Sequence, residues 1–335
     1  MLADSHNALA LTSDGEAIVF SGAPARVRDP SHGPNLYRAR PGEPPMLVYA
    51  GPRADSDLLP VAVGGGYVAF AEMNVPEFGD QGWILWLLPP GATEPVELDR
   101  NPADVRATFP LVTVNDRHVV WQHVTLGEAS RAELIEVSLP TMARRELHAD
   151  DATRYQWWDP ALDGDLLVYT EVDYVRGDPD SLDKPAELHT MLVDLAVDPI
   201  VPRQLDDSGM ATEPAIHDGT VTWKEAQDVT GWGALSVHSL ATGATEQVLT
   251  APQPGVKTPS LGNRFVAFWG LDATKFYLYD LKAGRIVPVY EVGETELDGA
   301  AYRPEVTGDL LVWAKATASG GFLVAWGRLP TMDDP

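Results

Sequence analysis

Residues 213–225 read Glu-Pro-Ala-Ile-His-Asp-Gly-Thr-Val-Thr-Trp-Lys-Glu. Apolar residues alternate with polar ones on both sides of Asp218-Gly219, and this pair permits the positive φ angles that a two-residue hairpin turn requires. The stretch therefore predicts two short antiparallel strands, the second of which carries the aromatic residue Trp223.

The same pattern recurs along the whole chain. An aromatic residue returns at intervals of 45 to 54 residues, and in six copies a proline precedes it by 9 to 11 residues. Proline lacks an N–H group and is tolerated at the first residue of a strand, so we expect each proline to begin an inner strand. The aromatic residues are Phe20, Phe70, Trp121, Tyr169, Trp223, Phe268 and Trp313, and the prolines are Pro60, Pro110, Pro160, Pro214, Pro259 and Pro304.

Two more strands are expected after each aromatic residue. In the fifth copy they are Leu235–Leu240 and Glu246–Thr250, separated by a turn at Gly243. Four antiparallel strands per repeat of this length form the blade of a β-propeller. The sequence therefore predicts an all-β, seven-bladed propeller in a single domain, 1–335, with six or eight blades as alternatives. The expected blades are 8–50, 58–99, 108–148, 158–205, 212–250, 257–290 and 302–329.

The last blade lacks an expected fourth strand. Its third strand is expected at Phe322–Trp326, and only Leu329–Pro335 follow. We expect Met1–Asp4 to supply the missing strand, because closing the ring removes open sheet edges. The alternative is that the native chain extends upstream and that these residues are a remnant.

Two repeats resemble those of a known family. Ser13-Asp14-Gly15 followed by Ile18-Val19-Phe20 resembles the repeat of TolB-type propellers, and Pro160–Tyr169 is similar to repeats of prokaryotic surface-exposed propellers. The resemblance covers about residues 8–329. It implies a propeller of the kind found in translocation proteins, surface proteins and peptidase-associated domains, and it favours an extracytoplasmic or cell-surface location.

Composition limits the partners that the chain can have. A net charge of −25 argues against binding to nucleic acid or to an anionic membrane surface. There is no run of 18 apolar residues and no signal-peptide pattern at the N-terminus, so we expect a soluble chain without membrane insertion, and a monomer. The absence of cysteine excludes disulfides, thiolate zinc sites and thiol catalysis.

The common catalytic and cofactor motifs are absent. There is no Gly-rich phosphate loop, no His-Glu-x-x-His and no Gly-x-Ser-x-Gly. One acidic segment could supply oxygen ligands to Ca²⁺ through Asp178, Asp180, Asp183 and Glu187, but it lacks the central glycine of an EF-hand loop. We therefore expect no cofactor, with a bound Ca²⁺ as the alternative to a solvated acidic insertion.

Candidate binding residues follow from position in the repeat. Loops before first strands and after second strands emerge on one face of a propeller, around the mouth of its channel. The residue before each proline and the residue two beyond each aromatic should line that mouth, because alternate strand residues share a face. The candidates are Asp159 and Glu171 in blade four, Glu213 and Glu225 in blade five, Arg303 and Lys315 in blade seven, and His123, Trp157 and Trp158.

Two interpretations of this cluster are open. The carboxylates could hold a cation, a zwitterion or a sugar, or could perform acid–base chemistry, and a divalent ion would neutralise their mutual repulsion. In the other interpretation these polar residues only tie neighbouring blades together through hydrogen bonds. No catalytic residue can be assigned.

Three function classes fit the sequence. The first is a non-enzymatic, TolB-like binding or scaffold module for a protein, small-molecule or carbohydrate ligand. The second is a carbohydrate-active propeller enzyme, either a polysaccharide lyase or a glycoside hydrolase. The third is a regulatory propeller domain of a larger protein. The fold permits all three, so the choice depends on the side chains at the site.

Overall fold

The architecture is seen in a computed structural model of the 335-residue chain. The structure describes residues 11–22, 35–51, 57–73, 82–101, 106–127, 130–174, 185–226, 233–249, 256–270, 275–291, 302–316 and 322–334. These residues form 28 strands and no helix. None of their elements is therefore a helix that could cross a membrane. The protein is a seven-bladed β-propeller of four-stranded antiparallel blades.

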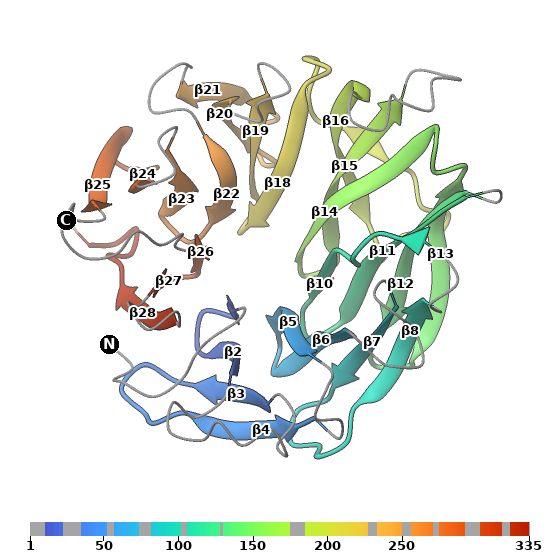
Figure 1. The fold of residues 1–335 in the computed structure, drawn as a ribbon. Coiled ribbons are helices and arrows are strands. Elements are labelled where there is room, and N and C mark those ends of the chain that lie inside the picture. Colours follow the sequence, from blue (N-terminus) through green and yellow to red (C-terminus); the bar gives the residue numbers. More distant parts are fainter. Residues whose placement is uncertain are drawn as a thin grey trace. The chain divides into compact units, whose positions relative to one another are not determined.

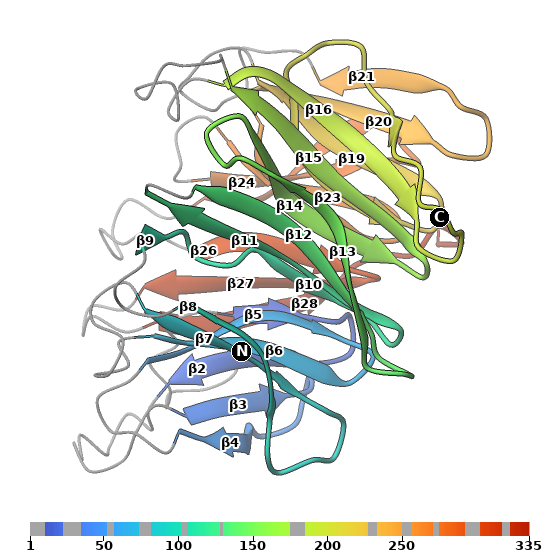
Figure 2. The same cartoon turned by 90° about the vertical axis from the view of Figure 1, so that its right-hand side faces the viewer.

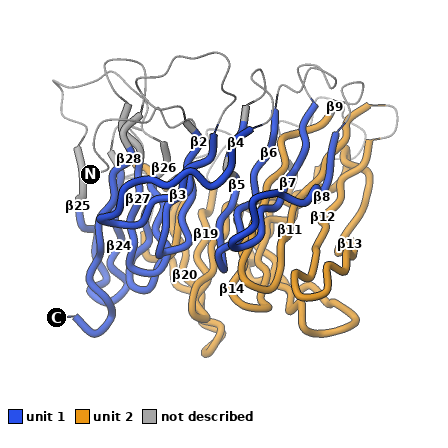
Figure 3. The backbone as a smooth tube through the Cα atoms, turned by 90° about the horizontal axis from the view of Figure 1, so that it is seen from below, with its two compact units in different colours: residues 1–105, 262–268, 272–335 blue, residues 106–261, 269–271 orange. Residues whose placement is uncertain are grey.

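Residue contacts divide the chain into two compact units, coloured separately in Figure 3: residues 1–105, 262–268 and 272–335, and residues 106–261 and 269–271. In the first unit, the first sheet contains β1 (Leu11–Ser13), β2 (Ile18–Gly22), β3 (Asn35–Ala39) and β4 (Met46–Ala50). The second contains β5 (Asp57–Gly64), β6 (Tyr67–Met73), β7 (Trp83–Leu88) and β8 (Val96–Asn101), which lie side by side in Figure 1. The seventh shows three described strands, β26 (Tyr302–Thr307), β27 (Leu310–Ala316) and β28 (Phe322–Arg328).

The second unit holds the third, fourth and fifth sheets. The third contains β10 (Val112–Val114), β11 (His118–Leu126), β12 (Arg131–Ser138) and β13 (Ala143–Asp150), and β9 (Arg106–Ala107) also pairs with β11. The fourth contains β14 (Tyr155–Asp163), β15 (Leu166–Tyr174), β16 (Pro185–Asp194) and β17 (Arg203–Gln204). The fifth contains β18 (Ala211–His217), β19 (Thr220–Ala226), β20 (Gly233–Ser239) and β21 (Thr245–Leu249). Figure 2 shows β14 to β16 along their lengths. The sixth sheet has the order β22 (Lys257–Leu261), β23 (Phe265–Trp269), β24 (Lys275–Asp280) and β25 (Arg285–Glu291).

The hairpin predicted around Asp218-Gly219 is present. These two residues have φ angles of 45° and 69°, and β18 pairs with β19 in antiparallel register on either side of them. Positive φ at both central residues is the geometry whose twist matches that of the flanking strands. The turn therefore fixes which residues of the two strands face each other, including the position of Trp223.

The prolines lie inside the inner strands, so the expectation that each begins a strand is wrong for five of the six. Pro214 is the fourth residue of β18, and only Pro110 lies ahead of its strand, β10. The pairing register shifts at Trp158/Ala161 and at Thr212/Ala215, where the strand bulges. A bulge takes the proline nitrogen out of the hydrogen-bonded ladder, which allows the strand to continue past a residue without an N–H group.

The repeated aromatic residues form the centres of the cores in both units. Six of the seven are at most 1% exposed, and Trp223 is completely buried in a cluster with Val168 of the fourth sheet and Val221 of the fifth. Trp313, unlike the other six, is only partly buried, and its ring centroid lies 5.6 Å from that of Phe276.

The first and seventh sheets pack against each other within the first unit. Ile18 and Phe20 share a buried cluster with Leu310 and Val312. The hydroxyl of Thr12 also donates to Glu305 at 3.5 Å. The two ends of the repeat series therefore meet directly, while the proposed closing strand Met1–Asp4 lies outside the described residues.

Replacing Trp223 with alanine should lower the free energy of unfolding by about 3–5 kcal/mol, because a buried indole is lost and a cavity remains. Phe109→Ala is the matched control, since Phe109 is 38% exposed, and it should cost less than about 1 kcal/mol. Urea denaturation of both variants measures the difference. Equal losses would show that Trp223 does not occupy a sheet-to-sheet core.

Candidate binding site at the mouth ends of the fourth and fifth sheets

The mouth end of a sheet is defined here as the end at which its first strand begins and its second strand finishes. Trp157, Trp158 and Asp159 lie on β14 near this end of the fourth sheet, and Glu171 lies opposite on β15, with the Cα of Trp157 paired to that of Glu171. In the fifth sheet Glu213 lies on β18 and Glu225 on β19. The structure thus places six of the predicted residues at equivalent ends of two successive sheets in one unit.

The bulges give two of these residues an unusual backbone. Asp159 and Glu213, each directly before a proline, have φ angles of 50° and 54°, and Thr258 has 48° at the same position of β22. Residues with a side chain adopt this left-handed region at a free-energy cost of about 1–3 kcal/mol. Surrounding hydrogen bonds must therefore hold the bulges in place.

Glu213 is the residue that makes these bonds. Its carboxylate accepts a hydrogen bond from Nζ of Lys224 at 2.6 Å and from the backbone N–H of Thr258 at 2.5 Å. Its own N–H donates to Oγ1 of Thr170 in the fourth sheet at 3.2 Å. One residue therefore links the first strands of the fifth and sixth sheets to the second strand of the fourth.

Lys224 was not among the residues predicted for the site. Its side chain is 4% exposed, and its Nζ lies 2.6 Å from the Glu213 carboxylate, so the two residues form an ion pair that is removed from most of the solvent. A buried ammonium is stable only when it is paired and hydrogen-bonded, and Glu213 meets that requirement. The sequence contains one indication that Lys224 is buried, because this lysine interrupts the apolar pattern of residues 221–226.

Glu171 belongs to an aromatic group in the fourth sheet. The indole Nε1 of Trp157 donates to Glu171 at 3.4 Å, and the Trp157 ring stacks on His148 at 5.3 Å between centroids. The Tyr169 hydroxyl bonds to Nε2 of His148 at 2.7 Å. Burial lowers the pKa of His148, whereas burial and the Glu171 charge raise the pKa of Tyr169. At neutral pH both His148 and Tyr169 are therefore uncharged, and neither balances the Glu171 charge.

Glu225 has a similar environment in the fifth sheet. Its Oε1 accepts hydrogen bonds from the indole of Trp223 at 3.1 Å and from the hydroxyl of Ser236 at 3.0 Å. Both donors are neutral, as is the indole that contacts Glu171. Glu171 and Glu225 are each only partly buried. Within the described part of the chain, these two carboxylates therefore have only neutral hydrogen-bond donors, whereas Glu213 is paired with Lys224.

The other predicted residues contribute less to the described site. Arg303 and Lys315 lie on β26 and β27, but the structure does not describe their side chains. His123 is half-buried on β11. Of the proposed Ca²⁺ ligands, Asp178, Asp180 and Asp183 lie outside the described residues, and Glu187 is exposed and bonds to Nε2 of His189 at 3.2 Å.

A bound divalent ion was one of the open interpretations of the four mouth carboxylates. Within the described ranges, which include all four, no three His, Asp or Glu side chains gather in a metal-binding arrangement. Three of the carboxylates have separate protein donors instead: Lys224 for Glu213, Trp157 for Glu171 and Trp223 for Glu225. The described geometry therefore suits separate hydrogen-bonding carboxylates rather than a shared ion.

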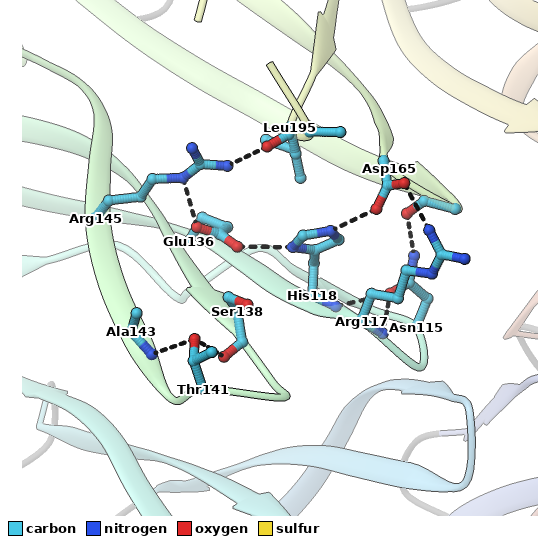
Figure 4. A network of polar contacts seen from close by, with 12 residues as sticks. Asn115, Arg117, His118, Glu136, Ser138, Thr141, Ala143, Arg145, Asp165 and Leu195 are labelled. Carbon is cyan, nitrogen blue, oxygen red and sulfur yellow. Dashed lines mark hydrogen bonds and ion pairs between the residues drawn. The ribbon is translucent and has the colours of Figure 1, made fainter. Parts of the chain in front are cut away.

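A second polar group, which the sequence analysis missed, joins the third and fourth sheets at the end opposite the mouth (Figure 4). Nδ1 of His118 lies 2.7 Å from Glu136, and its Nε2 lies 3.0 Å from Asp165. Arg145 donates to Glu136 at 2.7 Å and to the carbonyl of Leu195 at 2.7 Å. The hydrogen bond from His118 and the nearby charge of Arg117 lower the pKa of Asp165. This group acts as a clamp between sheets.

The sixth sheet has a clamp at the corresponding position. Arg264 follows the first turn of that sheet, as His118 does in the third, and donates two hydrogen bonds to Asp280 on the third strand, at 2.9 and 2.8 Å. Both side chains are buried. The guanidinium hydrogen bond lowers the pKa of Asp280 to about 2. Aligning the repeats for a basic residue after the turn and an acidic one on the third strand could have revealed both clamps.

Lys224→Met should lower the free energy of unfolding by about 3 kcal/mol, because it leaves the Glu213 charge without its partner. Adding Glu213→Gln should recover part of that loss, since glutamine can still accept the Thr258 N–H bond without carrying a charge. A double-mutant cycle by urea denaturation should give a coupling energy above about 1 kcal/mol. Additive effects would mean that the ion pair does not stabilise the bulge.

Asp280 should make stability depend on acid pH. Its pKa is 3.8 without the protein environment and about 2 in the fold, so its stabilisation is complete above about pH 4 and is lost as the pH falls through 2. Between pH 5 and pH 2 the wild type should lose about 2 kcal/mol more than Asp280→Asn. Asp116→Asn, at an exposed turn residue, is the control and should follow the wild type. Parallel curves for all three proteins would refute the assignment.

Comparison with known proteins supports the fold. No family model and no curated protein sequence matches the chain. An oligogalacturonate lyase from Vibrio parahaemolyticus superposes with a TM-score of 0.59 at 13% identity, covering 97% of this chain and 90% of the lyase. The β-propeller domain of the Trilobed protease from Pyrococcus furiosus gives 0.60 at 11% identity, covering 100% and 98%. A prolyl endopeptidase gives 0.66 at 11% identity, and the chain spans 47% of its length. These similarities establish that the chain has the β-propeller fold.

Proposed function

We propose that the protein is a non-enzymatic binding propeller of TolB type whose site is the mouth end of the fourth and fifth sheets. The observation that carries the proposal is that Glu171 and Glu225 are partly buried and receive hydrogen bonds from neutral indole and hydroxyl groups. Their charges are then available to a cationic or zwitterionic ligand. The ligand is a protein segment or small molecule that presents an ammonium or guanidinium group.

Two further features support this ligand class. Trp158 is half-buried on the strand that carries Asp159. Exposed tryptophan faces attract cations, and such contacts contribute about 0.5–1 kcal/mol at exposed sites. The strained backbone at Asp159 and Glu213 also fits a binding site, because strain of this kind concentrates where ligands are held.

A carbohydrate-active enzyme is the second candidate. It is supported by the oligogalacturonate lyases, one of which is in complex with manganese, because the chain covers 90% of each. Galacturonate is itself an anion, so it would be repelled by Glu171 and Glu225. This electrostatic mismatch favours the binding module. A regulatory domain of a larger protein is the third candidate, since the peptidase neighbours are about twice as long as this chain.

Calorimetric titration with a lysine-rich peptide, agmatine, glycine betaine, oligogalacturonate and Mn²⁺ tests the proposal. We expect the cationic probes to bind, with an affinity that falls as salt screens the charges. Glu171→Gln/Glu225→Gln should weaken binding about tenfold, which corresponds to roughly 1.4 kcal/mol. Glu94→Gln, at an exposed residue of the first unit, is the control and should bind as the wild type does.

Two results would contradict the proposal. Equal binding of a cationic probe to the wild type and to the double variant would place the site elsewhere. Cleavage of oligogalacturonate, with or without Mn²⁺, would favour the enzymatic candidate instead. The melting temperature of each variant is measured alongside, so that a loss of binding is not confused with unfolding.

A further inference from the structure

The segment that follows β28 is held by two basic residues of the sixth sheet. Nη1 of Arg264 donates to the carbonyl oxygens of Thr331 and Asp334 at 3.0 and 3.2 Å. Nζ of Lys282 donates to the carbonyl oxygens of Met332 and Asp334 at 2.8 and 2.6 Å. All of these residues belong to the first unit. Four charge-assisted hydrogen bonds thus join a short segment to a sheet other than the one it leaves.

The segment has a fixed local shape. The Asp334 carboxylate accepts hydrogen bonds from the N–H and the hydroxyl of Thr331, at 2.6 and 3.0 Å, and the Asp334 N–H donates back to the carbonyl of Thr331 at 3.2 Å. Just before it, the N–H of Leu329 donates to the carbonyl of Asp309 at 2.7 Å. This turn orients its carbonyl groups toward the side chains of Arg264 and Lys282.

In the sixth sheet, Asp280 orients the two basic residues that bind the segment. Asp280 binds Nε and Nη2 of Arg264, which directs Nη1 to the segment. The same carboxylate accepts the backbone N–H groups of Lys282 and Ala283, at 3.0 and 3.1 Å, and so fixes the turn from which Lys282 extends. One buried carboxylate therefore positions both donors. Preorganised donors lose less conformational freedom when they bind than flexible ones do.

We propose that residues 331–334 form a clasp that fastens the seventh sheet to the sixth. The seventh sheet packs against the first sheet through the Phe20–Leu310 cluster. On the side of the sixth sheet, the clasp adds four hydrogen bonds to the ring contact of Phe276 with Trp313. Release of the clasp should allow the seventh sheet to open locally while the rest of the fold stays intact. This inference is independent of the ligand proposed for the mouth end.

Hydrogen–deuterium exchange of the full chain tests the clasp, because it resolves local opening from global unfolding. Lys282→Ala should speed exchange in β28, residues 322–328, about tenfold, and leave β18 and β19, residues 211–226, unchanged. Lys282→Arg should keep exchange in β28 slow, as in the wild type, since an arginine can donate to the same carbonyl groups. Arg285→Ala, at an exposed residue of the same hairpin, is the matched control and should behave as the wild type does.

A chain shortened to end at Leu329 provides the second arm. It should speed exchange in β28 at least as much as Lys282→Ala does, because it removes the Arg264 bonds as well. Adding Lys282→Ala to the shortened chain should change nothing further, because the partners of Lys282 are already gone. The clasp is refuted if β28 exchanges at the wild-type rate in Lys282→Ala and in the shortened chain. It is refuted equally if exchange rises by the same factor in residues 211–226, since the effect would then be global.

Discussion

The missing N–H group of proline is the constraint on which the mouth ends of the sheets depend. Pro160 and Pro214 lie within inner strands, and the pairing register shifts around each of them. The residue before each proline is forced into the left-handed region, which turns its backbone N–H and side chain out of the regular ladder. Glu213 uses this freedom to bond to the fourth and sixth sheets. The bulge at Pro214 thus interrupts the pairing of β18 with β19 and allows Glu213 to connect three sheets.

The acidic residues at the ends of the sheets differ in whether a basic residue is paired with them. The clamps of Arg145 with Glu136 and of Arg264 with Asp280 pair a basic group with an acidic one, as does Lys224 with Glu213. Paired groups of this kind hold sheets together and leave no charge for a ligand. Glu171 and Glu225 have only neutral donors within the described residues, and this difference separates a candidate binding group from the structural ones.

The fold does not choose among the functions that similar structures perform. An oligogalacturonate lyase and a prolyl endopeptidase contain propellers that superpose on this chain at 11–13% identity. A propeller is assembled from similar sheets, so its buried residues define the repeat, whereas residues at the ends of the sheets determine the function. The charge pattern at the mouth ends is therefore the feature on which the proposed function rests.

The repeat, the seven sheets and the hairpin at Asp218-Gly219 could be predicted from the residues alone, because period, turn residues and apolar alternation are local properties. The sequence also placed Asp159, Glu171, Glu213 and Glu225 at equivalent sheet ends. The bulge at Pro214, the pairing of Lys224 with Glu213 and the contact of Arg264 with residues 331–334 could not be predicted in this way. Those outcomes depend on partners distant along the chain, whose approach is set by how sheets pack and not by the residues beside them.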